Sequence, residues 1–104
     1  MKRIRLRTAQ GDTPEDVLDW RDQLLVIARA PLNRESLDYE ELDRSVRLLK
    51  AIKGTPSGEV LELEDADHDH LVAKVKAARW VAADERVADM VRTVLGATDV
   101  AELG

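Results

Sequence analysis

The fold is decided by KRIRLR, residues 2–7, and by its counterpart EVLELE, residues 59–64. In both stretches charged and aliphatic side chains alternate, which is the two-residue period of a strand with one buried face. The outward charges of the first stretch are basic, and those of the second are acidic. Pairing the strands would set opposite charges across the ladder and bury four aliphatic side chains together, namely Ile4, Leu6, Leu61 and Leu63. We therefore predict that the two segments pair.

Helical periodicity fills most of the remaining chain. The first helix is expected to begin at Thr13, because a capping hydroxyl, a proline and two acids follow one another there, and to end before Pro31. Asp38 should cap the second helix, and Gly54 should end it in a left-handed conformation. Apolar residues recur at intervals of three and four over four ranges, 13–30, 38–53, 65–79 and 84–95.

The resulting order is β-α-α-β-α-α. If each element turns back on the one before, the second strand lies antiparallel to the first. The predicted fold class is α+β and mainly helical, with about four helices and a small two-stranded antiparallel sheet. We expect one globular domain over residues 1–96 and a flexible C-terminal tail over 97–104, where only Val100 and Leu103 could anchor the chain.

Composition narrows the class of protein. The 104 residues carry 16 basic and 21 acidic side chains, a formal charge of −5, which disfavours nucleic acid as the main partner. The absence of cysteine excludes disulfides and thiolate metal sites. No apolar run is long enough for a membrane span, and the start of the chain is too charged for a signal peptide. We expect a cytoplasmic protein without membrane contact.

The segment EDADHDH, residues 64–70, combines metal-ligand side chains, with His68 and His70 as weak candidates for metal ligands. On a helix, residues two apart point in different directions, so the two imidazoles should not converge. The acids at 65, 67 and 69 are explained more simply as partners of a positive helix N-terminus. We therefore predict no metal and no other cofactor.

A basic stripe runs along the second predicted helix, where Arg44, Arg47 and Lys50 are three residues apart. Together with the arginine face of residues 3–7, it could bind phosphates, which gives a small nucleic-acid-binding regulator as the alternative function. Acids four residues before the arginines, Glu40 and Asp43, should neutralise part of this stripe. With only three aromatic residues to stack on bases, we rank nucleic acid second.

Nothing in the chain indicates an enzyme. It contains no nucleophile-elbow or phosphate-cradling glycine motif, and only five glycines. Its serines cannot be assigned a base from sequence. We therefore expect a protein without catalytic activity.

Large apolar side chains at the ends of helices are more informative. Leu37 and Tyr39 lie beside the connector between the first two helices, and Trp80 lies at the joint between the last two. Such residues either close the core or anchor an interface. In the second case the acids of the 59–69 region, Glu62 and Glu64 among them, would face a basic protein partner. Homo-oligomers are compatible with this interpretation, because a two-stranded sheet has edges that a second copy could extend.

Three stretches carry a resemblance to a known group of proteins: WRDQLLVIARAPL (residues 20–32), RSVRLL (44–49) and LELEDADHDHL (61–71), which runs on to Trp80. They resemble small uncharacterised proteins of tailed bacteriophages and prophages that are often encoded among virion-assembly genes. The resemblance implies a non-enzymatic role in particle assembly or in handling a host protein, in the host cytoplasm or the virion. It carries no functional residue across to this chain.

Overall fold

The two alternating stretches form the antiparallel ladder that their pattern predicts. A computed structural model, which describes residues 1–33 and 35–100, pairs strand β1 (Lys2–Arg5) with strand β4 (Val60–Leu63). Ile4 lies opposite Leu61, and both are fully buried. Arg3 lies opposite Glu62, with 3.3 Å between Nη2 and Oε2. The predicted pairing and its antiparallel direction are confirmed.

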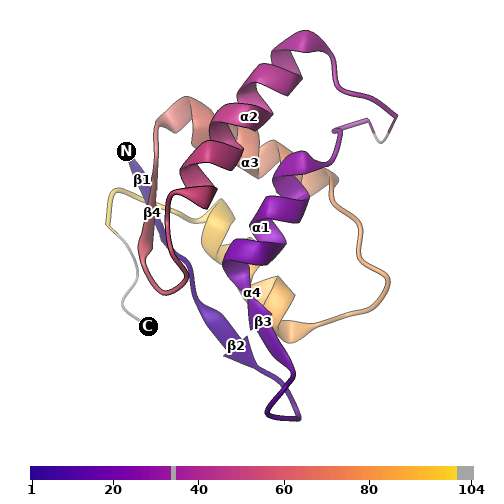
Figure 1. Ribbon diagram of the computed structural model, residues 1–104, viewed down its shortest axis with the longest axis vertical. Helices are drawn as coiled ribbons and strands as arrows, with labels where there is room; N and C mark the ends of the chain where they lie inside the picture. Colours follow the sequence, from indigo (N-terminus) through magenta and orange to yellow (C-terminus); the bar gives the residue numbers. More distant parts are fainter. Residues whose placement is uncertain (34, 101–104) are drawn as a thin grey trace.

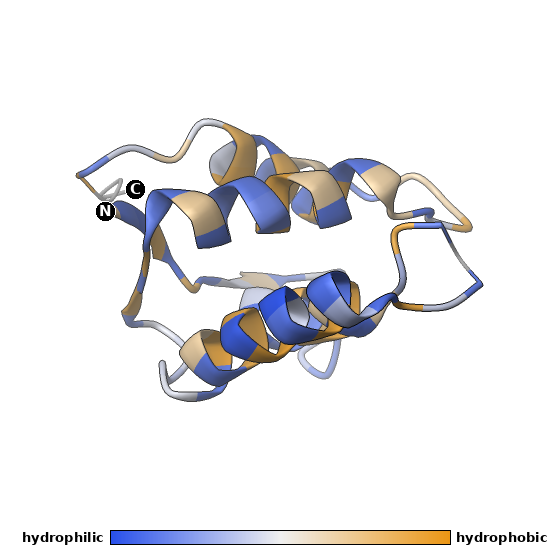
Figure 2. Cartoon of the chain, turned by 90° about the horizontal axis from the view of Figure 1, so that it is seen from above, coloured by the Kyte–Doolittle hydropathy of each residue, from blue (hydrophilic) through white to orange (hydrophobic). Residues whose placement is uncertain are grey.

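The described part of the chain also contains four helices (Figure 1): α1 (Trp20–Arg29), α2 (Tyr39–Lys53), α3 (Asp65–Ala77) and α4 (Glu85–Leu95). The α+β, mainly helical fold class is therefore confirmed. Helices α1 and α2 lie side by side, and α3 contacts both. Hydrophobic and hydrophilic bands alternate along the helices in Figure 2, as one-sided burial requires. None of the helices in the described ranges combines the length and the apolarity needed to cross a bilayer.

The first helix begins later than expected, and a β-hairpin replaces its predicted N-terminal part. Strand β2 (Thr8–Gln10) pairs with strand β3 (Val17–Asp19), an element that the sequence analysis missed. The start at Thr13 is wrong because residues 11–16 form the connection of this hairpin, closed by the Gly11 N–H, which donates to the Asp16 carbonyl at 2.6 Å. Asp19 caps α1 instead, accepting from the Arg21 N–H at 3.0 Å.

Side-chain caps fix the starts of α2 and α4. Asp38 accepts from the Glu41 N–H at 2.8 Å, as predicted, and Asp84 accepts from the Arg86 N–H at 2.9 Å. Gly54 does end α2, but with φ −77° it is right-handed, so the predicted left-handed cap is wrong. The left-handed conformation occurs four residues later, at Gly58 with φ 89°, in the turn that leads into β4.

The core lies between the β1–β4 ladder and the four helices. Met90 and Val94 bring α4 into it, and Trp20 enters from the first turn of α1 with 3% of its surface exposed. After α4 the chain returns to β1, where the Arg3 N–H donates to the Thr98 carbonyl at 2.9 Å. Of the tail predicted over 97–104, residues 101–104 lie outside the described residues. Other fully buried apolar side chains include Leu6, Leu24, Leu48, Ile52, Leu63, Leu71 and Val75.

Candidate functional site

The residues predicted to bind a partner do not share one surface. Glu62 is exposed on β4, and Glu64 is the N-cap of α3, whereas Trp80 follows the other end of α3. A helix of 13 residues is about 20 Å long, so the acids and the tryptophan lie far apart. Tyr39 is 81% exposed at the first turn of α2, and Leu37 is half-buried just before it. The structure thus separates an acidic end of α3 from an apolar end.

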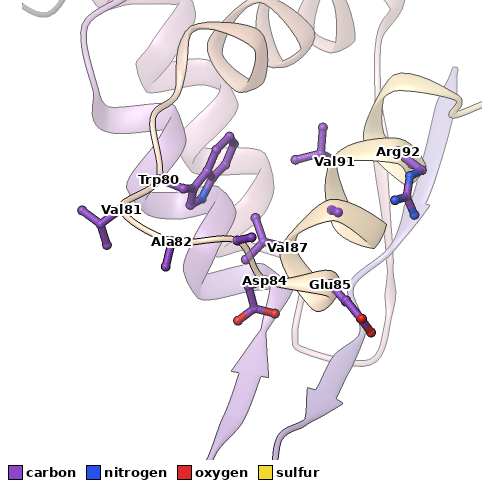
Figure 3. Close-up of a pocket in the computed structure, with 10 residues that line it drawn as sticks. Trp80, Val81, Ala82, Asp84, Glu85, Val87, Val91 and Arg92 are labelled. Atoms are coloured by element: carbon purple, nitrogen blue, oxygen red, sulfur yellow. The ribbon is translucent and has the colours of Figure 1, made fainter.

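Trp80 lines an open groove between the α3–α4 loop and α4. The groove has a volume of about 890 Å³. In Figure 3, Trp80 projects from the loop, and Val87 and Val91 project from α4 on the side that faces the loop. Most of the other lining residues are also apolar: Val81, Ala82, Ala83 and Ala88, beside Asp84, Glu85 and Arg92.

The groove remains open because the loop stands away from the core. Trp80 is 42% exposed, and Val81 is fully exposed. Trp80 is therefore not a closure of the core, which was one of its two expected roles. Exposed tryptophan and valine side chains beside a concave apolar surface are typical of an interface.

Two ion pairs of Arg86 fix the end of the groove where α4 begins. Arg86 Nη2 lies 2.9 Å from Asp84 Oδ2, and Arg86 Nη1 lies 3.2 Å from Asp16 Oδ1 in the hairpin connection. The side-chain and backbone hydrogen bonds from Arg86 lower the pKa of Asp84 below its usual value. The side-chain hydrogen bond with Asp84 in turn raises the pKa of Arg86. The unpredicted β2–β3 hairpin thus anchors one side of the groove.

The two histidines diverge, as their spacing predicts. His68 Nε2 lies 2.8 Å from the Val94 carbonyl of α4, which makes this nitrogen the donor. His70 Nε2 lies 3.1 Å from Ser45 Oγ of α2. In the described ranges, no group of three or more possible ligand side chains surrounds a metal position. Asp65 and Asp67 lie in the first turn of α3, as expected, but Glu64 at the cap makes no side-chain bond there.

The Ser45 and His70 side chains resemble a nucleophile and its base in their separation only. Ser45 is 2% exposed and His70 is 7% exposed. A substrate therefore cannot reach Ser45 Oγ in this conformation. The contact instead joins α2 to α3 inside the protein.

A buried ion pair, which was not predicted from the sequence, lies beside His70. Lys74 Nζ lies 2.8 Å from Glu41 Oε2 and 2.5 Å from the Ala30 carbonyl, with 1% of the Lys74 side chain exposed. Glu41 Oε2 also accepts from the Leu32 N–H at 2.9 Å. The pair therefore connects α2, α3 and the α1–α2 connector. The available signal was the position of Lys74, three residues after Leu71 and next to Val75 on the apolar side of α3.

Burial and the nearby positive charge of Lys74 lower the pKa of His70 below its usual value of 6.5. Glu41, Arg44 and Asp67 also face it, and the two carboxylates oppose the shift. Burial alone would raise the pKa of Glu41, but the hydrogen bonds from Lys74 and from the Leu32 N–H, together with the positive charge of Lys74, outweigh burial, and the pKa is lowered.

We predict that acidification destabilises the protein through His70. Its folded pKa lies below its unfolded pKa, so the unfolded state binds the proton first, and stability falls as the pH drops through 6.5 toward the folded pKa. The contribution of Glu41 is lost only further down, as the pH falls from 4.5 through its lowered pKa. Urea unfolding between about pH 8 and about pH 5 measures the first effect. His70→Gln should flatten the pH dependence in this window, and an unchanged slope would contradict the assignment.

The basic stripe lies on the exposed side of α2. Arg44, Arg47 and Lys50 are all exposed, and Arg47 Nη2 lies 3.5 Å from Asp67 Oδ2 of α3. Among the ion pairs of the described residues, neither Arg44 nor Arg47 pairs with the acid four residues before it. The predicted neutralisation within α2 is therefore replaced, at Arg47, by a contact between helices.

The arginine face of β1 is largely occupied. Arg3 pairs with Glu62, and Arg5 Nη1 donates to the Gly58 carbonyl at 3.0 Å. The Arg7 guanidinium lies over the Trp20 ring, 5.4 Å from its centroid. These arginines therefore stabilise the fold itself, which reduces what they can offer to phosphates.

Comparisons with known proteins identify no relative. No family model matches the sequence, and neither the curated proteins nor the solved structures contain a significant match.

Proposed function

We propose that this chain is a non-enzymatic protein-interaction or assembly module whose docking face is the groove beside Trp80. The observation that carries the proposal is the exposure of Trp80 and Val81 beside an apolar groove. Burying such side chains against a partner removes apolar surface from water, which is the main favourable term in association.

The partner expected at this face is apolar at its centre and charged at its edges. Arg79 comes just before the lining residues and the acidic Glu85 lies among them, so charges of both signs border the apolar lining. The basic partner expected from Glu62 and Glu64 would bind elsewhere, at the opposite end of α3. The resemblance to phage proteins implies a role in particle assembly. A small module of this kind suits that role, and it suits action in the cytoplasm.

Nucleic-acid binding through Arg44, Arg47 and Lys50 is the second candidate. It is supported by the exposure of all three side chains along α2. It ranks below protein binding because Asp67 lies against Arg47 and the chain is acidic overall. A low-salt gel-shift assay should show no retardation of duplex or single-stranded DNA. Retardation that Arg44→Glu abolishes would favour this candidate instead.

Site-specific photocrosslinking in producing cells tests the docking face. A photoreactive phenylalanine analogue at Val81 should give a discrete adduct with a protein. The matched control is Val26 on α1, which is an exposed valine (63%) outside the groove. The proposal predicts an adduct at position 81 that is absent at position 26. No adduct at 81, or the same adducts at both positions, would contradict it.

A further inference from the structure

We propose that the occupant of the groove is a second copy of this chain, docked about a two-fold axis that passes close to Ala82. The inference rests on the proposed function, since it assigns the partner of the same surface. It follows from the order of residues along the loop, from the shape of the groove and from the unpaired backbone of the loop.

The charge order along the loop is self-complementary. Residues 79–85 read RWVAADE, with a basic end, an apolar middle and an acidic end. A two-fold axis at the middle runs the two loops in opposite directions, so Arg79 of each copy faces Glu85 of the other. Both side chains are exposed, and the ion pairs of the described residues use neither of them within the chain. Each is thus available for the charge on the other copy.

The apolar residues have the complementary shapes that such a dimer requires. Val81 is fully exposed and, in Figure 3, points away from α4, whereas Val87 and Val91 line the concave side. An isologous contact inserts the projecting Val81 of each copy into the groove of the other. Each copy then also covers the Trp80 side chain of the other. One surface therefore supplies both halves of the interface.

The backbone of the loop is also unused. Within the described ranges, residues 79–83 make no hydrogen bond to another backbone group. Two such segments running antiparallel can bond to each other across the axis, as strands do. This arrangement would satisfy polar groups that the docked apolar side chains would otherwise remove from water.

Paired charge reversals test the axis directly. Arg79→Glu alone places glutamate against Glu85 in both contacts of the dimer, and Glu85→Arg alone places arginine against Arg79. Each variant should therefore associate at least about tenfold more weakly than the wild type. An equimolar mixture of the two variants restores opposite charges at both contacts, so it should form mixed dimers. Sedimentation velocity from about 10 µM to about 1 mM covers the range expected for a small interface.

The outcomes separate this inference from the proposed function. Concentration-dependent dimers of the wild type, weaker dimers of each variant and recovery in the mixture would support it. A wild type that stays monomeric, or a mixture that is as weak as its components, would overturn it. The crosslink at Val81 distinguishes the two ideas, because an adduct at twice the chain mass indicates a second copy. An adduct with another protein would keep the docking face and reject the dimer.

Discussion

Replacing Glu41 by leucine should lower the free energy of unfolding by about 3 kcal/mol, because the change leaves the Lys74 ammonium buried without its counter-charge. Lys74 is 1% exposed and, among the residues that the structure describes, retains only the Ala30 carbonyl as a partner. The connector also loses the acceptor for the Leu32 N–H. Equilibrium urea unfolding at neutral pH measures the change.

A double-mutant cycle supplies the control for this prediction. Lys74→Met should cost less than Glu41→Leu, since the remaining carboxylate is 13% exposed and can be hydrated. The double variant, with leucine and methionine facing each other, should recover most of the loss, because an apolar pair carries no desolvation penalty. Equal losses in the two single variants, or simple additivity in the double variant, would contradict a buried charge as the cause.

Leu61→Ala should be similarly damaging, with a loss of between about 2 and about 5 kcal/mol. Leu61 is fully buried on β4 opposite Ile4, at the ladder that joins the two alternating segments. The shortened side chain leaves a cavity beneath the helices, which close-packed neighbours fill only in part. Thermal and urea unfolding should both report the loss.

Val26→Ala is the matched control for Leu61→Ala. It removes apolar atoms from a side chain that is 63% exposed on α1, so stability should change by less than about 0.5 kcal/mol. Similar losses for the two variants would show that the ladder is not part of the core.

The β1–β4 ladder could be predicted because two separate features of the sequence indicate it. Alternation identifies each strand separately, and the opposite outward charges identify the partner, as the Arg3–Glu62 pair confirms. The boundaries of α2 and α4 were equally accessible, because Asp38 and Asp84 cap through bonds that span two or three residues. These features depend on neighbours in sequence or on a pattern that repeats.

The β2–β3 hairpin could not be predicted from the same kind of signal. A proline followed by acids suits the first turn of a helix and the connection of a hairpin equally well. The choice depends on the pairing of Ala9 with Leu18 across the connection, and three-residue strands carry too little alternation to reveal it. Val17 lies in the range expected for the first helix, 13–30, but in the structure it belongs to β3 and is 48% exposed.

The candidate site was predicted in part. Sequence identified Trp80 as an anchor or a core closure, and only the structure shows the groove and the exposure of Val81 beside it. A surface that combines Trp80 with the β4 acids does not form, because the length of α3 separates them. The Lys74–Glu41 pair was missed since lysine and glutamate are ordinarily surface residues.

The most direct test of the account is whether Trp80 is accessible to solvent in the isolated, dilute protein. The two tryptophans give separate indole signals in proton–nitrogen NMR spectra, and Trp80→Phe assigns them. A soluble paramagnetic agent should broaden the ring signals of Trp80, which is 42% exposed, and leave those of Trp20, which is 3% exposed, sharp. Equal protection of both rings would show that the chain closes the groove with its own residues and would contradict the docking face.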